Sequence, residues 1–210
     1  GNFFMTLLQP MTFAPILAFI GIVLRMISKS DRKHNLGIIF IGFAILMFGM
    51  ELMSDSMATV RTVPGFDKFL ASLKSPIIAL LVSTVFTGVI QSSAATIGIV
   101  QALALTGVIT WQMAIPLVLG ANIGTCVTAI ISSFGTNKNA KRVVTMHFFV
   151  NVFGSVLCMV IMYAIKAFGV TLLNAQIDMV GVAIVHTLFN LVTTVVLFPI
   201  KKLIIKFCEF

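Results

Sequence analysis

The stretch PIIALLVSTVFTGVIQSSAATIGIVQALALTGV, residues 76–108, contains two apolar runs joined by three polar residues. The first run, Pro76–Ile90, would make a helix of about 22 Å, shorter than the hydrocarbon thickness of a bilayer. The second, Ala94–Val108, has a similar length. Two short helices around a polar turn predict a re-entrant hairpin, because irregular backbone within a membrane must be buried in protein or face water. Two tilted full spans joined by a polar turn are the alternative.

The composition of the whole chain indicates a membrane environment. Of the 210 residues, 59% are hydrophobic and 10% are charged, and the mean hydropathy is +1.12. Soluble proteins are about 45–50% apolar and about 25% charged. The net charge of +8 comes from basic residues in short polar breaks between apolar runs. That distribution is typical of membrane topology signals, so a membrane protein is favoured over a nucleic-acid-binding protein.

Five further apolar runs are long enough to cross a bilayer, which takes about 20 residues. They are Met5–Ile27, Leu36–Met53, Trp111–Phe134, Val143–Ile165 and Met179–Ile200. The segment Ser54–Ser75 mixes apolar and charged residues at helical spacing, which predicts an interfacial helix interrupted at Pro64-Gly65. The predicted fold class is therefore an all-α polytopic membrane protein. It has about five transmembrane helices, an interfacial helix and a re-entrant helical hairpin.

The basic residues are distributed unevenly over the predicted loops. Counting five crossings and the hairpin assigns ten to one side, namely Arg25, Lys29, Arg32, Lys33, Lys138, Lys141, Arg142, Lys201, Lys202 and Lys206. The other side has four, Arg61, Lys68, Lys74 and Lys166. Because the more basic side faces the cytoplasm, we expect a cytoplasmic C-terminus and an external N-terminus. Since the chain shows no signal-peptide pattern, this orientation leads us to expect further spans upstream.

The apolar segments carry no catalytic pattern. They contain no Ser/His/Asp ordering, no paired carboxylates and no His/Cys/Glu cluster with metal-ligand spacing, so we expect neither an enzyme nor a bound metal. The cysteines Cys126, Cys158 and Cys208 show no disulfide or metal spacing. HFFVN (147–151) and HTLFN (186–190) each place a His four residues before an Asn. We favour hydrogen bonds to neighbouring helices as their role.

The residues between the two hairpin helices could bind ions. Gln91, Ser92 and Ser93 offer an amide, two hydroxyls and the free backbone N–H groups at the start of the second helix. Such groups bind anions without a formal positive charge, and their oxygens equally suit a hard cation such as Na⁺. A simple polar turn is the alternative. No Lys or Arg lies nearby, so a bound anion would need helix dipoles and co-bound cations, which predicts cation-coupled transport.

A second polar motif lies about thirty residues further along the chain. It is GANIGT, residues 120–125, followed by Thr128. Its two glycines are four residues apart, a small-xxx-small pair that is typical of helix packing. The competing interpretation is an opened helix in which Asn122 and Thr125 offer oxygen ligands. Both polar motifs are predicted to lie near the middle of the membrane.

The segments FTGVIQSSAATIGIVQALALTG, VLGANIGTCVTAI and HFFVNVFGSVL resemble the type II sodium/phosphate cotransporter family, most closely its bacterial branch. The resemblance extends from about Leu36 to Pro199. It implies inverted repeats, each with a re-entrant hairpin and a Gln-Ser-Ser tip, which together bind phosphate and Na⁺ near the midplane. The implied phosphate-binding residues are Gln91, Ser92 and Ser93. The implied sodium-binding residues are these three with Asn122, Thr125 and Thr128.

The family pattern has two Gln-Ser-Ser motifs, whereas this chain has one and resembles the second half. We expect a single transmembrane domain, 1–210, in which 5–27 is a linker span and 36–200 is one hairpin-bearing repeat. Ala94 stands where the family usually has a third serine, and Cys126 where it usually has a second threonine. The missing half is expected either as a separate segment or as a second copy of the chain.

The resemblance implies Na⁺-coupled transport of inorganic phosphate by alternating access, in a bacterial inner membrane. Na⁺ is then a co-transported ion, not a prosthetic cofactor. The expected partners are phosphate, Na⁺, the lipid bilayer and a second repeat half or a homodimer partner. A non-transporting half-subunit that needs a partner chain is one alternative. An ion-coupled transporter or exporter of another small anion is the other.

Overall fold

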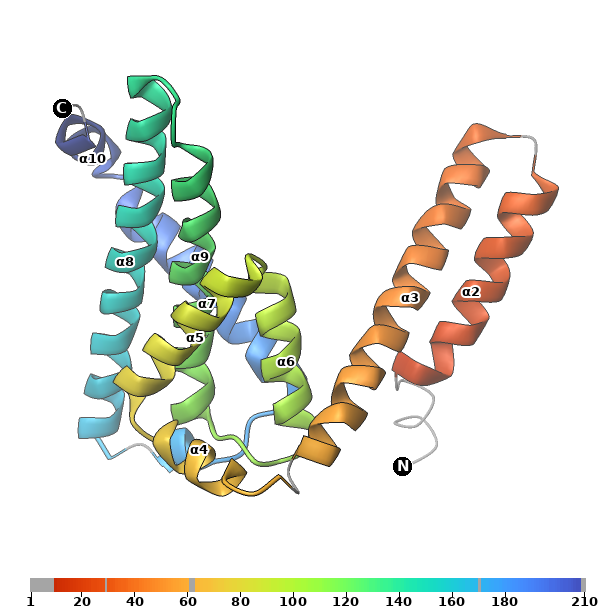
Figure 1. Cartoon of the computed structure of the whole chain (residues 1–210), viewed down its shortest axis with the longest axis horizontal. Coiled ribbons are helices and arrows are strands. Elements are labelled where there is room, and N and C mark those ends of the chain that lie inside the picture. Colours follow the sequence, from red (N-terminus) through yellow and green to blue (C-terminus); the bar gives the residue numbers. More distant parts are fainter. Residues whose placement is uncertain (1–9, 29, 61–62, 170, 209–210) are drawn as a thin grey trace. The chain divides into compact units, whose positions relative to one another are not determined.

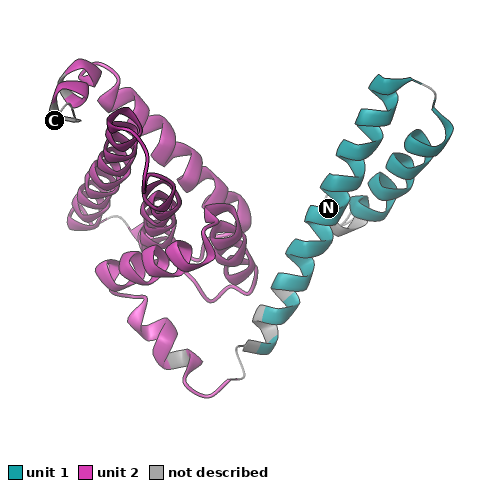
Figure 2. Ribbon diagram, turned by 45° about the horizontal axis from the view of Figure 1, so that its top comes forward, with its two compact units in different colours: residues 1–59 teal, residues 60–210 magenta. Residues whose placement is uncertain are grey.

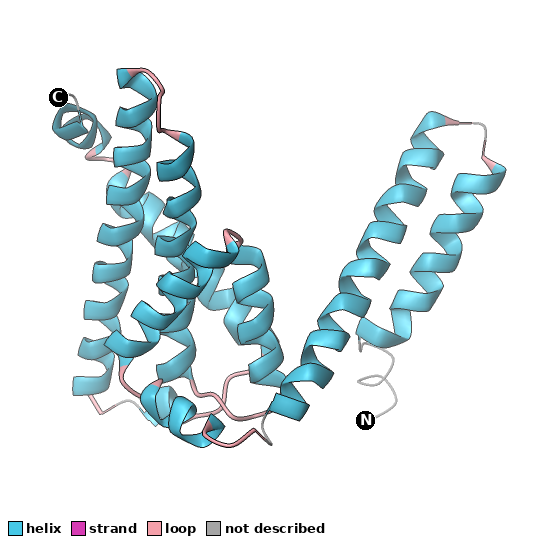
Figure 3. Cartoon of the chain, viewed as in Figure 1, coloured by secondary structure: helices cyan, strands magenta, loops and turns pink. Residues whose placement is uncertain are grey.

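The computed structural model describes residues 10–28, 30–60, 63–169 and 171–208, and Figures 1 and 3 show that they form helices joined by loops. In chain order these are α2 (Pro10–Ile27), α3 (Asp31–Val60), α4 (Phe66–Ser72), α5 (Pro76–Ile90), α6 (Ser93–Leu105), α7 (Trp111–Ser132), α8 (Lys138–Ala167), η1 (Thr171–Asn174), α9 (Met179–Leu197) and α10 (Lys201–Cys208). Within these ranges the β pairing is a single isolated bridge between Thr110 and Gln176. The predicted all-α fold is confirmed.

The chain divides into two compact units, residues 1–59 and 60–210 (Figure 2). In the first unit, α2 and α3 approach closely at two glycines. A Cβ atom on Gly37 would lie 2.7 Å from the carbonyl oxygen of Gly21, and one on Gly21 would lie 2.8 Å from that of Gly37. Any larger residue at either position would push the helices apart, so glycine permits this contact.

Four helices of the described chain are long and apolar enough to cross a membrane. They are residues 31–53 of α3, together with α7, α8 and α9. These match four of the five predicted spans. The fifth, Met5–Ile27, begins outside the described residues, and its described part contains the shorter apolar segment Phe13–Ile27. The chain is therefore a multi-pass membrane protein.

The predicted interfacial segment Ser54–Ser75 is divided between two helices. Its first residues continue α3 as far as Val60, and α4 begins at Phe66. The break at Pro64-Gly65 is confirmed, since Gly65 has a positive φ of 94° directly before α4. The prediction that a separate helix starts near Ser54 is wrong, because polar residues that follow a span do not by themselves end a helix.

The helices α5 and α6 form a hairpin where the sequence predicts one. They have 15 and 13 residues and are joined through Gln91 and Ser92. Close to the turn, the buried hydroxyl of Thr87 donates a hydrogen bond of 2.8 Å to the hydroxyl of Thr96. Figure 1 shows the turn between the two ends of the second unit, not at either end. The helix pair is confirmed, and its re-entry into a membrane remains a prediction.

The predicted opening of the helix at GANIGT is wrong, because α7 runs without a break from Trp111 to Ser132. The glycines of the motif face α5. A Cβ on Gly124 would lie 2.6 Å from the carbonyl oxygen of Thr84, and one on Gly120 would overlap the carbonyl oxygen of Leu80. The structure therefore confirms the helix-packing interpretation of the two glycines.

The helices α8, α9 and α10 complete the second unit. Gly154 of α8 lies directly against the side chain of Thr193 of α9. Leu197 at the end of α9 and Ile204 of α10 form a small buried cluster with apolar side chains of α8. Figure 1 shows α10 and the start of α8 at one end of the unit and α4 at the other. The basic residues of α10 and of the start of α8 thus lie at the same end, as the topology prediction requires.

Candidate functional site

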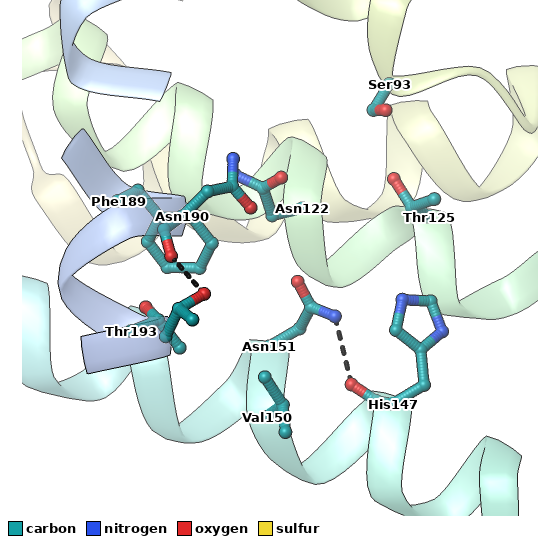
Figure 4. A pocket seen from close by; sticks show the side chains of 10 residues that line it. Ser93, Asn122, Thr125, His147, Val150, Asn151, Phe189, Asn190 and Thr193 are labelled. Atoms are coloured by element: carbon teal, nitrogen blue, oxygen red, sulfur yellow. Dashed lines mark hydrogen bonds between the residues drawn. The ribbon is translucent and has the colours of Figure 1, made fainter. Parts of the chain in front are cut away.

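A pocket of about 270 Å³ lies where α6, α7, α8 and α9 meet (Figure 4). Ten residues line it, namely Ser93, Asn122, Thr125, His147, Val150, Asn151, Phe189, Asn190, Thr193 and Thr194. Three of the predicted ligands, Ser93, Asn122 and Thr125, are among them. The structure thus brings residues of both polar motifs to one cavity.

The backbone of Gln91 adopts an unusual conformation at the hairpin tip. Its φ of 60° and ψ of 25° are left-handed, and it is the one non-glycine residue with positive φ in the described chain. Gln91 is the C-cap of α5, and its N–H still donates a helical hydrogen bond of 2.7 Å to the carbonyl oxygen of Thr87. A side chain in this conformation costs about 1 kcal/mol relative to glycine. The exposed Gln91 side chain does not line the pocket.

The two serines of the tip have different positions. Ser92 is the N-cap of α6, and its hydroxyl accepts a hydrogen bond of 3.2 Å from the N–H of Ala95. Ser93 is the first residue of α6 and lines the pocket. The first N–H groups of a helix have no partner within it, and they carry the positive end of the helix dipole. The side of the pocket formed by the start of α6 therefore favours an anion.

The polar side chains of α7 are bonded largely within their own helix. The amide of Asn122 donates to the carbonyl oxygen of Val118 at 3.1 Å. The hydroxyl of Thr125 donates to the carbonyl oxygen of Ala121 at 2.9 Å, which leaves its lone pairs for a ligand. Thr128 donates to Thr125 at 2.8 Å and is not part of the pocket lining. These bonds satisfy the polar side chains within a continuous helix.

The histidine of α9 fixes the position of Asn122. Its Nε2 atom lies 3.3 Å from the amide oxygen of Asn122. Because the Asn122 nitrogen already donates to its own helix, the oxygen is the acceptor and the imidazole of His186 donates. Asn122 is only 7% exposed, so this bond satisfies a buried acceptor and holds α9 against α7 at the pocket.

The wall formed by α8 and α9 was missed as a site in the sequence, although its residues fall within the two His-x-x-x-Asn stretches and just beyond. Asn151 donates to the carbonyl oxygen of His147 at 2.9 Å (Figure 4). Asn190 donates to that of His186 at 2.9 Å. The expectation of bonds to a neighbouring helix is confirmed for His186 and for Asn151, whose side chain also bonds to Cys126 of α7. Asn190 bonds instead within its own helix. The repeated pattern was the available signal.

No Lys, Arg, Asp or Glu is among the ten residues that line the pocket. A doubly charged anion placed there would have no formal countercharge from the lining. Charge in a membrane interior is costly unless it is compensated. Apart from His147, compensation for such an anion would have to come from outside the side chains of the lining, for example from the dipole at the start of α6 or from a co-bound cation.

Comparison with known proteins gives one family. The model of the Na⁺/Pi-cotransporter family matches residues 3–55 and 45–187. The chain is 25% identical over 197 residues to "Putative inorganic phosphate export protein YjbB" of Salmonella typhimurium, which covers 93% of this chain and 36% of that protein. It is 30% identical over 187 residues to an uncharacterized protein of Bacillus subtilis, YqeW, covering 88% of this chain and 60% of that one.

A eukaryotic relative matches a shorter part. The sodium-dependent phosphate transport protein 2B of Bos taurus is 39% identical over 118 residues, 54% of this chain and 17% of that protein. No solved structure matches. The chain spans about a third of the length of YjbB. Because the family model covers most of its residues, the chain belongs to the Na⁺/Pi-cotransporter family.

Proposed function

We propose that the chain forms part of a transporter that moves inorganic phosphate together with Na⁺ by alternating access. The observation that carries this proposal is the pocket between the start of α6 and the oxygens of α7, α8 and α9. Its lining has no charged side chain, so it suits an anion and a cation bound together better than either alone. The name of the bovine relative, a sodium-dependent phosphate transport protein, supports the choice of ions.

At the hairpin tip, the proposed phosphate ligands are Gln91, Ser92 and Ser93. Ser93 faces the pocket, and Ser92 orients the free N–H groups by capping α6. Gln91 keeps a left-handed backbone that glycine would adopt at less cost. A side chain retained at such a cost supports a functional role. The same three residues, with Asn122, Thr125 and Thr128, are the proposed Na⁺ ligands.

The proposed site is completed by a second Gln-Ser-Ser hairpin. In this chain the Gln91 side chain is exposed, and Gln91 is not among the residues that line the pocket. A hairpin from the other inverted repeat, or from a second copy of the chain, would cover it. We propose a bacterial inner membrane as the location. The cytoplasmic C-terminus then follows from the basic residues of α10 and of the start of α8.

Phosphate export is a second candidate. The match to YjbB, whose printed name gives phosphate export, covers 93% of the chain, whereas the match to the bovine sodium-dependent protein covers 54%. The two functions share the pocket and differ in the direction of net flux. Measuring influx and efflux of phosphate in the same vesicles under imposed Na⁺ gradients separates them.

The test uses the full protein in proteoliposomes with radiolabelled phosphate. An inward Na⁺ gradient should drive uptake, and an equal K⁺ gradient should not. Gln91→Ala and Ser92→Ala should each abolish the Na⁺-dependent component. Ser133→Ala, at a half-buried serine directly after α7 and outside the pocket lining, should leave it unchanged. Normal flux in both tip variants would overturn the site. Stronger competition by arsenate or sulfate than by phosphate would overturn the choice of substrate.

A further inference from the structure

We propose that the wall of the pocket formed by α8 and α9 is a second Na⁺ site, with oxygen ligands from Asn151, Asn190 and Thr193. It lies across the pocket lining from the hairpin tip and is separate from the ligands proposed on α6 and α7. The proposal rests on the proposed function for the identity of the cation. Its evidence is the pattern of donors and acceptors in this wall.

The two asparagines present their oxygens to the pocket. The amide nitrogen of Asn151 donates to the carbonyl oxygen of His147, and that of Asn190 donates to the carbonyl oxygen of His186, each at 2.9 Å. In each case the nitrogen is used within its own helix four residues back. This bond fixes the orientation of each amide, and the amide oxygen is the acceptor that each side chain can offer to a ligand. The repeated arrangement on two neighbouring helices gives two acceptors in one lining.

Thr193 supplies the independent observation. Its side chain is 3% exposed, and its hydroxyl oxygen is buried without a hydrogen-bond partner among the described residues. Gly154 of α8 leaves the space that this side chain occupies. A buried hydroxyl without a partner costs free energy that a bound ligand would recover. Thr193 belongs to the same pocket lining as the two asparagines, and a hydroxyl without a partner beside these acceptors indicates a ligand in this wall.

The chemistry of the wall selects a cation over an anion. Phosphate accepts hydrogen bonds and needs donors, which the start of α6 offers and the two asparagine oxygens do not. Oxygen ligands without thiolate or carboxylate suit a hard cation of low charge. Thr194 adds a fourth oxygen whose proton is already donated to the carbonyl oxygen of Asn190 at 2.7 Å. The pocket thus has a donor side and an acceptor side, and it can hold an ion pair.

The experiment measures Na⁺ binding without phosphate and without flux. The full protein is purified in detergent, and thermal unfolding is followed by the fluorescence of its single tryptophan, Trp111. NaCl, KCl and choline chloride are compared at equal ionic strength. A ligand that binds the folded state raises the Tm in a saturable way, so Na⁺ should raise it and choline should not.

The variants isolate the hydroxyl. Thr193→Val should raise the Na⁺ concentration for half-maximal stabilisation about tenfold, the effect of losing one good ligand. Its Tm in choline should be unchanged or higher, because a buried hydroxyl without a partner has been removed. Thr193→Ser keeps the hydroxyl and should keep the Na⁺ response. Thr187→Val, at an exposed threonine of the same helix, should behave like the wild type.

The outcomes separate this site from the proposed function. A Na⁺ response that is weakened about tenfold in Thr193→Val and kept in Thr193→Ser supports the site, even if phosphate is not the transported anion. Ser93→Ala, which changes the proposed phosphate site at the hairpin tip, should lose the additional stabilisation by phosphate. An equal Na⁺ response in Thr193→Val and the wild type, or no difference between Na⁺ and choline, would overturn the site and leave the flux experiment unaffected.

Discussion

At Gln91 the chain leaves helical geometry, whereas at Asn122 the helix continues unchanged. Both residues are amides in the middle of apolar runs, and both are followed by small and hydroxylated residues. At the first, Ser92 adopts an extended conformation and caps a new helix. At the second, the amide bonds to the carbonyl oxygen of Val118 and to His186 of α9.

The difference between the two segments comes from their neighbours. The glycines of α7 contact the backbone of α5, and this packing holds α7 straight although Asn and Gly are poor helix formers. At the hairpin tip, Gln91 adopts a left-handed conformation and Ser92 caps the next helix. A polar residue in an apolar run thus marks a helix end only where capping residues are present and packing does not oppose the break.

The largest expected effect comes from breaking the packing that keeps α7 continuous. In Gly124→Ala the new Cβ would lie 2.6 Å from the carbonyl oxygen of Thr84, so α5 must move away. We expect a loss of stability of about 3 kcal/mol, measured as a lower Tm in detergent. Gly42→Ala, in a helix position with no atom within 4 Å, is the control and should be neutral or slightly stabilising. Equal Tm values for Gly124→Ala and the wild type would refute the packing argument.

The second-largest effect is expected from the hydrogen bond between His186 of α9 and Asn122 of α7. His186→Leu leaves the buried oxygen of Asn122 without a donor and should cost about 2 kcal/mol. The double variant Asn122→Leu/His186→Leu should recover part of that loss, because no polar atom is then left unpaired. A double-mutant cycle from chemical unfolding measures the coupling, which we expect to be about 1 kcal/mol. Strictly additive losses would show that the two side chains do not interact.

A smaller effect tests the two arms of the hairpin. Thr87 donates to Thr96 at 2.8 Å, and Thr96 in turn donates to the carbonyl oxygen of Ser92 at 3.3 Å. Thr87→Val removes the first of these bonds and should cost about 1 kcal/mol in unfolding experiments. Thr84→Val is the matched control, because the Thr84 hydroxyl bonds only within its own helix. If both variants lose the same stability, the link between the arms is not what stabilises the turn.

The smallest expected effect is a gain in stability, whereas the preceding variants lose stability. Gln91→Gly places at the turn the residue that prefers a left-handed backbone, so the Tm should rise by the equivalent of about 1 kcal/mol or slightly less. Gln91→Ala keeps the Cβ and should not show this gain. A lower Tm for Gln91→Gly would mean that the side chain of Gln91 contributes to folding, not only to function.

Local signals allowed the hairpin to be predicted almost to the residue. Pro76 is tolerated at the start of a helix and Ser92 is a favoured N-cap, so the starts of both hairpin helices are visible in the sequence. The end of α3 at Val60 could not be predicted from the sequence, because helix continuation past the last apolar residue depends on solvent and packing.

The pocket could be predicted only in part. Asn122 and Thr125 belong to a recognisable motif, but their bonds to α7 itself were not foreseen. The wall of α8 and α9 depends on how four helices meet, which no local pattern specifies. Sequence placed His and Asn four residues apart, and the structure added that His147, Asn151 and Asn190 line one cavity, whereas His186 bonds to Asn122. The repeat proposed over 36–200 stays a prediction, since the compact units divide near residue 59.

Na⁺-driven phosphate uptake by Gln91→Gly, beside the wild type in proteoliposomes, tests the central claim most directly. The substitution is expected to preserve the fold, so a loss of flux cannot be attributed to unfolding. The account predicts Na⁺-dependent uptake in the wild type and none in a Gln91→Gly protein of equal or higher Tm. Uptake at the wild-type rate in that variant would contradict the assignment of the hairpin tip as the phosphate site.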